Sequence, residues 1–286
     1  MVLSISDLDL EKIAESGQCF RWQREDGGAY RIPHGDACLY IRKEAPGRFF
    51  LDCPEEEFDA VWRPYFDLGT DYAAIAARID PDDDPYLCAA MGDQWGVRIL
   101  RQDAWEMLVT SIVTQNRNIP AIQRSAALLA CLGGTRKRDR RGREFYTFPT
   151  PEQLLSMGEE KLSQCRLGYR EGYVKQAAEA VCSGKLSMER LCEASDGECR
   201  ELLLRQYGIG EKVAACVMLF GLHRLNAFPR DVWMNRMLAE YYPRGFPFER
   251  YAPYNGVYQQ YLFAYYRKTA AAPKKQGGPH AGKLPA

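Results

Sequence analysis

The stretch Leu202–Leu238, LLLRQYGIGEKVAACVMLFGLHRLNAFPRDVWMNRML, decides the fold of this chain. Its first apolar helical run is interrupted by Gly208 and Gly210, which flank one apolar residue, and a second run then continues to Phe220. Glycine reaches positive φ without strain, so this spacing predicts a tight turn between two helices. The N–H groups that open the second helix then point outward, where they can hold a phosphate. We therefore expect a helix-hairpin-helix over residues 202–220.

Three residues in this stretch carry chemical groups that a simple turn does not need. Lys212 and Cys216 are four residues apart, so they share one face of the second helix. Asp231 follows Lys212 by 19 residues, and Pro229 places it at the start of another helical pattern. Taken alone, Lys212 is a phosphate contact or a solvated lysine, and Asp231 is an N-cap. Phosphate binding gains nothing from a nearby carboxylate, however, so the pair together favours catalysis.

Composition places the chain among ordinary soluble globular proteins. It has 286 residues, 46% of them hydrophobic and 27% charged, which allows a large core and two or three subdomains. Its net charge is zero and its pI is near 6.8, so the whole chain has no nucleic-acid signature. Residues 136–143 (RKRDRRGR) nevertheless form a basic cluster with six Lys or Arg and one Asp. This cluster is either a phosphate-binding patch or a solvated loop.

Cysteine usage indicates a reducing intracellular compartment. The ten cysteines are scattered, no C-x-x-C occurs, and none follows Cys216, which excludes zinc-ribbon spacing and a C-terminal iron–sulfur cluster. We find no signal peptide and no apolar run near the ~18 residues that span a membrane. We expect a monomer with mostly buried free thiols and no membrane partner.

The N-terminal segment reads as an antiparallel meander. Ser4–Glu15 predicts a strand and a turn, and Ser16–Trp22 (SGQCFRW) predicts a glycine turn that leads into a half-buried strand. Turn formers separate three further predicted strands at 29–32, 37–41 and 48–51. From Pro54 onward the apolar period becomes helical. A boundary near residues 80–95 separates a first domain, residues 1–95, from a helical region, residues 96–268.

The helical region contains two polar junctions and one unpatterned loop. Asn116 and Asn118 lie between two helical runs, where asparagines are usually caps, and the loop 133–151 has no apolar period. Tyr169 and Arg170 follow a glycine that breaks a helix; they form either a surface pair or a wedge and a base reader. Residues 269–286 are rich in Ala, Pro, Lys and Gly, which predicts a disordered tail.

Four of these motifs, in this order, resemble those of the 8-oxoguanine DNA glycosylases, the lysine-nucleophile branch of the helix-hairpin-helix (HhH-GPD) glycosylases. They are SGQCFRW from Ser16, TQNRNI ending at Ile119, LGYREGYV from Leu167, and the hairpin with its FPRDV continuation. The resemblance spans residues 3–267. It implies an α+β fold, in which a twisted antiparallel β-domain precedes a mostly α-helical glycosylase domain. It also implies that the chain flips 8-oxoguanine out of double-stranded DNA, excises it and nicks the abasic site.

The resemblance assigns a role to each matched residue. Lys212 is the nucleophile and Asp231 the catalytic carboxylate. Base recognition is assigned to Gly17, Cys216, Gln259 and Phe263, the wedge and opposite-base contacts to Asn116, Tyr169 and Arg170, and DNA phosphate contacts to Gly208, Gly210 and Trp233. No organic cofactor is required, and the hairpin carbonyls near Ile209 are expected to hold a monovalent or divalent cation shared with a DNA phosphate.

The expected chemistry requires the lesion to leave the duplex, at a cost of a few kcal/mol of unstacking. Guanine N7 accepts a hydrogen bond, whereas the oxidised base carries N7–H, so a fixed carbonyl at Gly17 discriminates by about 1–3 kcal/mol. Asp231 stabilises the cationic sugar when the C1′–N9 bond breaks, and Lys212, as a neutral amine, attacks C1′. The resulting Schiff base permits β-elimination of the 3′ phosphate.

The chain departs from the family pattern at two positions, and two alternative functions stay open. The eukaryotic branch has an arginine that reads the opposite cytosine where this chain has Ala121, so we predict a relaxed opposite-base preference. Trp233 stands where relatives often have histidine, which affects the expected phosphate contact. The alternative functions are a glycosylase of the same fold for alkylated bases and a non-catalytic DNA-binding module.

Overall fold

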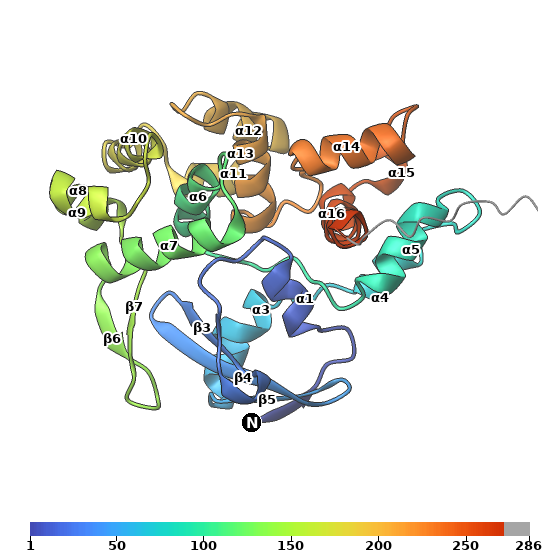
Figure 1. The fold of residues 1–286 in the computed structure, drawn as a ribbon, viewed down its shortest axis with the longest axis horizontal. Helices are drawn as coiled ribbons and strands as arrows, with labels where there is room; N and C mark the ends of the chain where they lie inside the picture. The colour runs from blue at the N-terminus through green and yellow to red at the C-terminus, as the bar shows by residue number, and fades with distance from the viewer. Residues whose placement is uncertain (272–286) are drawn as a thin grey trace, which may run out of the picture.

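The computed structural model describes residues 1–271, in which an N-terminal antiparallel sheet is followed by a mostly helical region (Figure 1). The α+β class predicted from the sequence is confirmed. The last helix, α16, spans Asn255–Ala271, so residues 269–271 are helical, and the predicted start of the disordered tail at residue 269 is wrong for these three. The rest of the predicted tail, residues 272–286, lies outside the described residues.

The five strands of the sheet lie in the order β1-β5-β4-β3-β2, with every neighbouring pair antiparallel. Their bounds are β1 Val2–Ser4, β2 Gln23–Arg24, β3 Tyr30–His34, β4 Ala37–Ala45 and β5 Arg48–Leu51. Glycines with positive φ, Gly35 and Gly47, make the tight turns on either side of β4. The meander expected from the alternating turn formers is therefore present.

Two N-terminal predictions are wrong in detail. The strand β1 ends at Ser4, and a helix, α1 (Leu10–Glu15), follows where only a strand and a turn were predicted. Asp9 caps this helix by accepting a hydrogen bond from the Lys12 N–H at 3.1 Å. Residues 16–22 form an irregular turn, and the following strand, β2, has only two residues. A short irregular segment can point its main-chain groups away from the sheet.

Helices account for most of the rest of the chain. Those up to residue 133 are α2 Glu55–Glu57, the π-helical η2 Phe58–Trp62, α3 Arg63–Tyr65, α4 Tyr72–Ala76, α5 Pro85–Asp93, α6 Ala104–Val113 and α7 Ile119–Gly133, with a 3-10 turn, η1, at Asp26–Gly28. Those that follow are α8 Pro151–Ser156, α9 Gly158–Gln164, α10 Arg170–Cys182, α11 Met188–Glu193, α12 Asp196–Leu204, α13 Glu211–Cys216, the π-helical η3 Val217–Gly221, α14 Val232–Tyr241 and α15 Phe248–Tyr251. Among the described residues, no helix combines the length and the apolarity that a membrane crossing needs.

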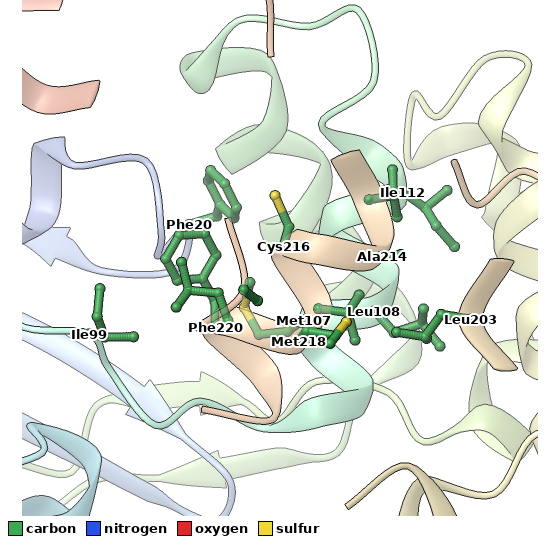
Figure 2. Close-up of a cluster of buried hydrophobic side chains, with 14 of the residues drawn as sticks. Phe20, Ile99, Met107, Leu108, Ile112, Leu203, Ala214, Cys216, Met218 and Phe220 are labelled. Atoms are coloured by element: carbon green, nitrogen blue, oxygen red, sulfur yellow. The ribbon is translucent and has the colours of Figure 1, made fainter. Parts of the chain in front are cut away.

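The predicted hairpin between two helices is formed by α12 and α13. Gly208 has φ +80°, and a side chain there would overlap the ring of Tyr173. A Cβ added to Gly221, at the end of η3, would lie 3.0 Å from the Cβ of Met107. The segment α13–η3 therefore packs closely on α6. Figure 2 shows the apolar side chains of this contact, among them Met107, Met218 and Phe220.

The described residues contain two hydrophobic cores, and the domain boundary near residues 80–95 stays a prediction. The sheet, α1 and the α2–α3 segment enclose one core. Buried side chains of α4 and α5, such as Tyr72 and Leu87, belong to the larger helical core, where α5 packs on α16 (Figure 1). Arg98 joins the two halves, because its buried guanidinium donates to the Phe66 carbonyl at 3.0 Å and the Thr70 carbonyl at 2.8 Å.

The basic cluster in the loop 133–151 is a β-hairpin, which the lack of an apolar period did not predict. Strands β6 (Arg136–Arg138) and β7 (Glu144–Tyr146) pair antiparallel and extend toward the N-terminal sheet (Figure 1). The hairpin is fixed there by ion pairs Arg140–Glu57 (2.6 Å), Arg141–Asp52 (2.7 Å), Arg143–Glu25 (2.6 Å), Lys137–Asp36 (2.6 Å) and Arg31–Asp139 (2.8 Å). Acidic groups of the same chain therefore occupy much of the charge that could have bound phosphate.

Candidate functional site

The amine of Lys212 is held where α6 ends and α13 begins. Gly210 is the N-cap of α13, and Lys212 is its second residue, so the side chain begins beside the open N–H groups of the hairpin. Lys212 Nζ donates to the hydroxyl of Thr114 at 2.6 Å, and Thr114 caps the C-terminus of α6. The lysine is half-buried. Its amine is thus held in one place while one side remains accessible.

Cys216 is the third residue that the sequence singled out in this stretch, and it ends α13. Its thiol is buried one helical turn beyond Lys212, in the cluster of apolar side chains that also contains Phe20 (Figure 2). Burial raises the pKa of the Cys216 thiol, with Asp231 adding to the effect and the charge of Lys212 opposing it. Lys212 and Cys216 are both in α13, four residues apart, so they share a helix face.

Asp231 caps α14 as its residue type suggested. One carboxylate oxygen, Oδ1, accepts the N–H of Met234 at 2.8 Å, and the other accepts no hydrogen bond within residues 1–271. No ion pair joins Asp231 to Lys212 in this part of the chain. The capping bond fixes the carboxylate while leaving one oxygen free. The N-cap interpretation and the catalytic one are therefore compatible.

The turn at Gly17 presents a free carbonyl between two engaged ones. The Ser16 carbonyl accepts the side-chain amide of Gln260 at 2.7 Å, and the Gln18 carbonyl accepts that of Gln102 at 2.8 Å. Within the described residues, the carbonyl of Gly17 accepts no hydrogen bond. Gly17 has φ +80°, a conformation that glycine adopts without strain. Both neighbours of Gly17 are anchored, so its carbonyl has a defined direction.

Two residues of α16 complete the region in front of Gly17. The ring of Phe263 lies against Gly17, with Cε1 3.6 Å from the position of an added Cβ, and Arg267 stacks over the same ring at 5.3 Å. Gln259 is only 3% exposed, yet its side-chain oxygen has no hydrogen-bond partner among the described residues. A buried amide without a partner is costly. Gln259 therefore has an unmet capacity to bind a polar ligand edge.

The wedge candidates form one connected group. Asn116, which has φ +50°, donates from its side-chain amide to the hydroxyl of Tyr169 at 3.1 Å, and both side chains are exposed. Arg170 stacks on the Tyr169 ring at 4.2 Å but is only 6% exposed. Its guanidinium donates to the carbonyl of Gln115 at 2.7 Å and to that of Leu167 at 3.1 Å. In this structure Arg170 acts as a clamp between two loops.

The hairpin connects directly to this wedge group. The side-chain amide of Gln115 donates to the Gly208 carbonyl at 3.0 Å, while the Gln115 carbonyl accepts from Arg170. Gly210 is the N-cap of α13, and no side chain caps this helix end. A Cβ added to Gly210 would meet no atom within 4 Å. Ile209 is buried, and no main-chain N–H in residues 1–271 donates to its carbonyl. Gly210 and Ile209 thus keep the free N–H and carbonyl groups that a phosphate and a cation need.

Two hollows flank the site. One, of about 630 Å³, is lined by Lys212 together with Arg200, Arg230 and Phe228. The other, of about 710 Å³, is lined by Ile119, Trp233 and Arg267. Trp233 is 38% exposed and packs edge-on against Tyr266 at 6.4 Å. An exposed indole offers a stacking face where the sequence placed a phosphate contact.

Comparison with known proteins places this arrangement in a family. A family model for the N-terminal domain of 8-oxoguanine DNA glycosylase matches residues 1–108. The N-glycosylase/DNA lyase of Saccharomyces cerevisiae is 34% identical over 267 residues, covering 85% of this chain and 70% of the relative. The chain belongs to the 8-oxoguanine DNA glycosylase family.

Solved structures of the family agree with this assignment. That of MBOgg1 in complex with a low-affinity DNA ligand is 36% identical, with a TM-score of 0.87 over 94% of this chain and 96% of that one. The Clostridium acetobutylicum 8-oxoguanine glycosylase/lyase, bound to double-stranded DNA with cytosine opposite 8-oxoguanine, is 30% identical, with a TM-score of 0.86 over 94% and 98%. The family resemblance drawn from four motifs is confirmed.

The sequence did not predict a role for two residues of the site, Thr114 and Gln115. Thr114 holds the amine of Lys212, and Gln115 joins the hairpin to Arg170. Both precede Asn116 directly and lie in the motif TQNRNI. Their position in that motif was the available signal. Their partners lie roughly 50 to 100 residues away in the chain, so spacing could not identify them.

Proposed function

We propose that this chain excises 8-oxoguanine from double-stranded DNA and then nicks the abasic site. The observations that support this most are the Lys212 amine held by Thr114 at 2.6 Å, the Asp231 carboxylate fixed by Met234, and an anchored turn whose Gly17 carbonyl accepts no hydrogen bond within residues 1–271. A DNA-binding module that only holds phosphates needs neither a lysine amine fixed by a hydroxyl group nor a carboxylate with one oxygen left for the sugar. The family relatives are named for both activities, glycosylase and lyase.

Base recognition follows from the groups left without partners. The oxidised base enters between Phe263 and Cys216, with its N7–H donating to the Gly17 carbonyl. Its Watson–Crick edge meets the side-chain amide of Gln259, whose buried oxygen has no partner within the described residues. Guanine presents an N7 acceptor to the same carbonyl, and the resulting repulsion lowers its affinity. Phe263 lies against Gly17 here, so the ring moves when the base enters.

The bond-breaking steps use Lys212 and Asp231. The free oxygen of Asp231 stabilises positive charge on the sugar as the C1′–N9 bond breaks. The neutral amine of Lys212 attacks C1′ and forms a C1′–N bond. The C1′–O4′ bond then breaks, O4′ keeps the electron pair and takes up the proton that the amine loses, and a Schiff base with the opened deoxyribose results. Removal of a C2′ proton then expels the 3′ phosphate by β-elimination, and water releases the lysine.

DNA contacts surround this centre. Asn116 and Tyr169 fill the space left by the flipped base, with Arg170 as the reader of the opposite base. The N–H groups near Gly208 and Gly210 bind phosphate without a charged side chain. No organic cofactor takes part in these steps. The carbonyl of Ile209, which no main-chain N–H within residues 1–271 engages, is proposed to share a cation with a DNA phosphate.

Opposite-base preference is proposed to be relaxed relative to the eukaryotic branch. The reason is that Ala121 lacks the side chain that reads cytosine there. Cleavage rates opposite each of the four bases measure this, and a strict requirement for cytosine would contradict it.

Borohydride trapping tests the proposed reaction. Wild type is incubated with a duplex that carries 8-oxoguanine, and a Lys212→Gln variant serves as the matched control. We expect a covalent protein–DNA product for wild type and none for the variant. A glycosylase for alkylated bases would release those bases from their own duplexes without trapping on 8-oxoguanine. A non-catalytic module would retard both duplexes in a gel and cleave neither.

A further inference from the structure

Arg117 lies in the turn between α6 and α7, next to the exposed Asn116. Its Nη1 donates to the hydroxyl of Ser125 at 2.7 Å, and its Nη2 donates to the main-chain carbonyl of Arg166. A guanidinium has five N–H donors. No other acceptor among the described residues takes one of them, so three donors remain available. The mechanism described above does not use this residue.

Ala121 lies on α7 between Arg117 and its partner Ser125 in the sequence. Ala121 and Ser125 are spaced i,i+4 on α7, so they share one face of the helix. Arg117 precedes Ala121 by the same interval, and its side chain reaches Ser125 by crossing that face. A longer side chain at position 121 would compete for the space that the guanidinium occupies.

Arg117 also lies beside the wedge group. Burial and the neighbouring guanidinium of Arg170 lower the pKa of Arg117, and Tyr169 opposes this. Arg170 is buried with its donors on main-chain carbonyls, as described above. Arg117 is only half-buried. Of the two guanidiniums, Arg117 can reach an incoming base with less rearrangement.

We infer that Arg117 is a specificity-determining residue, whose free N–H donors contact the Watson–Crick edge of the base opposite the flipped nucleotide. This inference rests on the proposed function. A guanidinium only donates, so it favours an edge rich in acceptors. Cytosine offers two, N3 and O2, whereas thymine and guanine place an N–H at the centre of this edge. Arg117 therefore retains part of the cytosine preference that Ala121 would otherwise remove.

The test uses two variants that remove the guanidinium in different ways. Arg117→Gln removes the charge, and Ala121→Leu keeps the charge but fills the space beneath it. Arg124→Ala is the matched control, because Arg124 is an exposed arginine on the same helix. The value of kcat/KM for excision is measured on 8-oxoguanine duplexes with each of the four opposite bases. Thermal unfolding of every variant is measured in parallel.

The expected result for Arg117→Gln is a fall of about tenfold in the ratio of kcat/KM opposite cytosine to that opposite thymine, which is the loss of one charge-assisted hydrogen bond. Ala121→Leu lowers the same ratio, and Arg124→Ala leaves it unchanged. An equal loss opposite all four bases would assign Arg117 a purely structural role and overturn the inference, as would an unchanged ratio. If wild type releases 8-oxoguanine opposite no base, the proposed function itself is wrong.

Discussion

Gly17→Ala separates the conformational role of this residue from its role in base recognition. Alanine at φ +80° costs about 1–2 kcal/mol in the left-handed region. The added methyl group lies 3.6 Å from Phe263 Cε1 and 3.9 Å from Ile119 Cδ1, which are ordinary contacts, so overlap adds little to that cost. At about 2–4 °C per kcal/mol for a chain of this length, we expect the variant to unfold a few degrees lower.

The effect on catalysis is expected to exceed the effect on stability. The methyl group projects into the space that the base needs between the Gly17 carbonyl and Phe263, and a displacement of about 1 Å can cost on the order of 100-fold in rate. The assay compares excision of 8-oxoguanine with cleavage of a preformed abasic site. We expect excision to fall by that order and abasic-site cleavage to stay within about twofold, because the lyase step requires no base in the pocket. An equal fall in both activities would refute the reasoning.

Three further outcomes are expected. Asp139→Asn should destabilise the protein by about 2–3 kcal/mol at neutral pH in denaturant unfolding. The pKa of Asp139 is lowered because its hydrogen bonds outweigh burial, so this contribution is fully present above the unfolded pKa of about 4. The difference from wild type should shrink as pH falls from there through the lowered folded pKa. Cys216, with a raised pKa and a buried thiol, should resist iodoacetamide at pH 8 while the exposed Cys131 reacts; mass spectrometry showing equal modification would contradict this. Thr114→Val removes the acceptor of the Lys212 amine and should slow borohydride trapping by up to about tenfold with little change in melting temperature, and an unchanged trapping rate would exclude a role for this hydroxyl.

The basic hairpin shows how charge in a sequence can be misread. Residues 136–143 have the composition of a phosphate-binding patch, yet Asp139 lies at the centre of a network that includes Arg31 and the hydroxyl of Tyr40, both at 2.8 Å. The guanidinium of Arg141 stacks over the same tyrosine at 3.7 Å. Acidic partners in the N-terminal sheet are distant in sequence. Pairing between them could therefore be seen only in the folded chain.

Much of the site could be predicted because its signals are local. Gly208 and Gly210 need a turn, Lys212 and Cys216 share a helix face, and Asp231 caps a helix, all within one stretch of the chain. Spacing along a helix fixes which side chains are neighbours, so these relations follow from the residue order. The order of four motifs then identified the family.

The sequence by itself determined the chemical groups of this protein, the two helices of the hairpin and the antiparallel sheet, since each depends on residues close together in the chain. Only the tertiary structure decided that Thr114 holds the amine of Lys212 and that Arg117 donates to Ser125 and Arg166. It also decided that the buried side-chain oxygen of Gln259 has no hydrogen-bond partner within residues 1–271. These contacts join separate segments. Their formation depends on how the helices pack, and no local propensity encodes that packing.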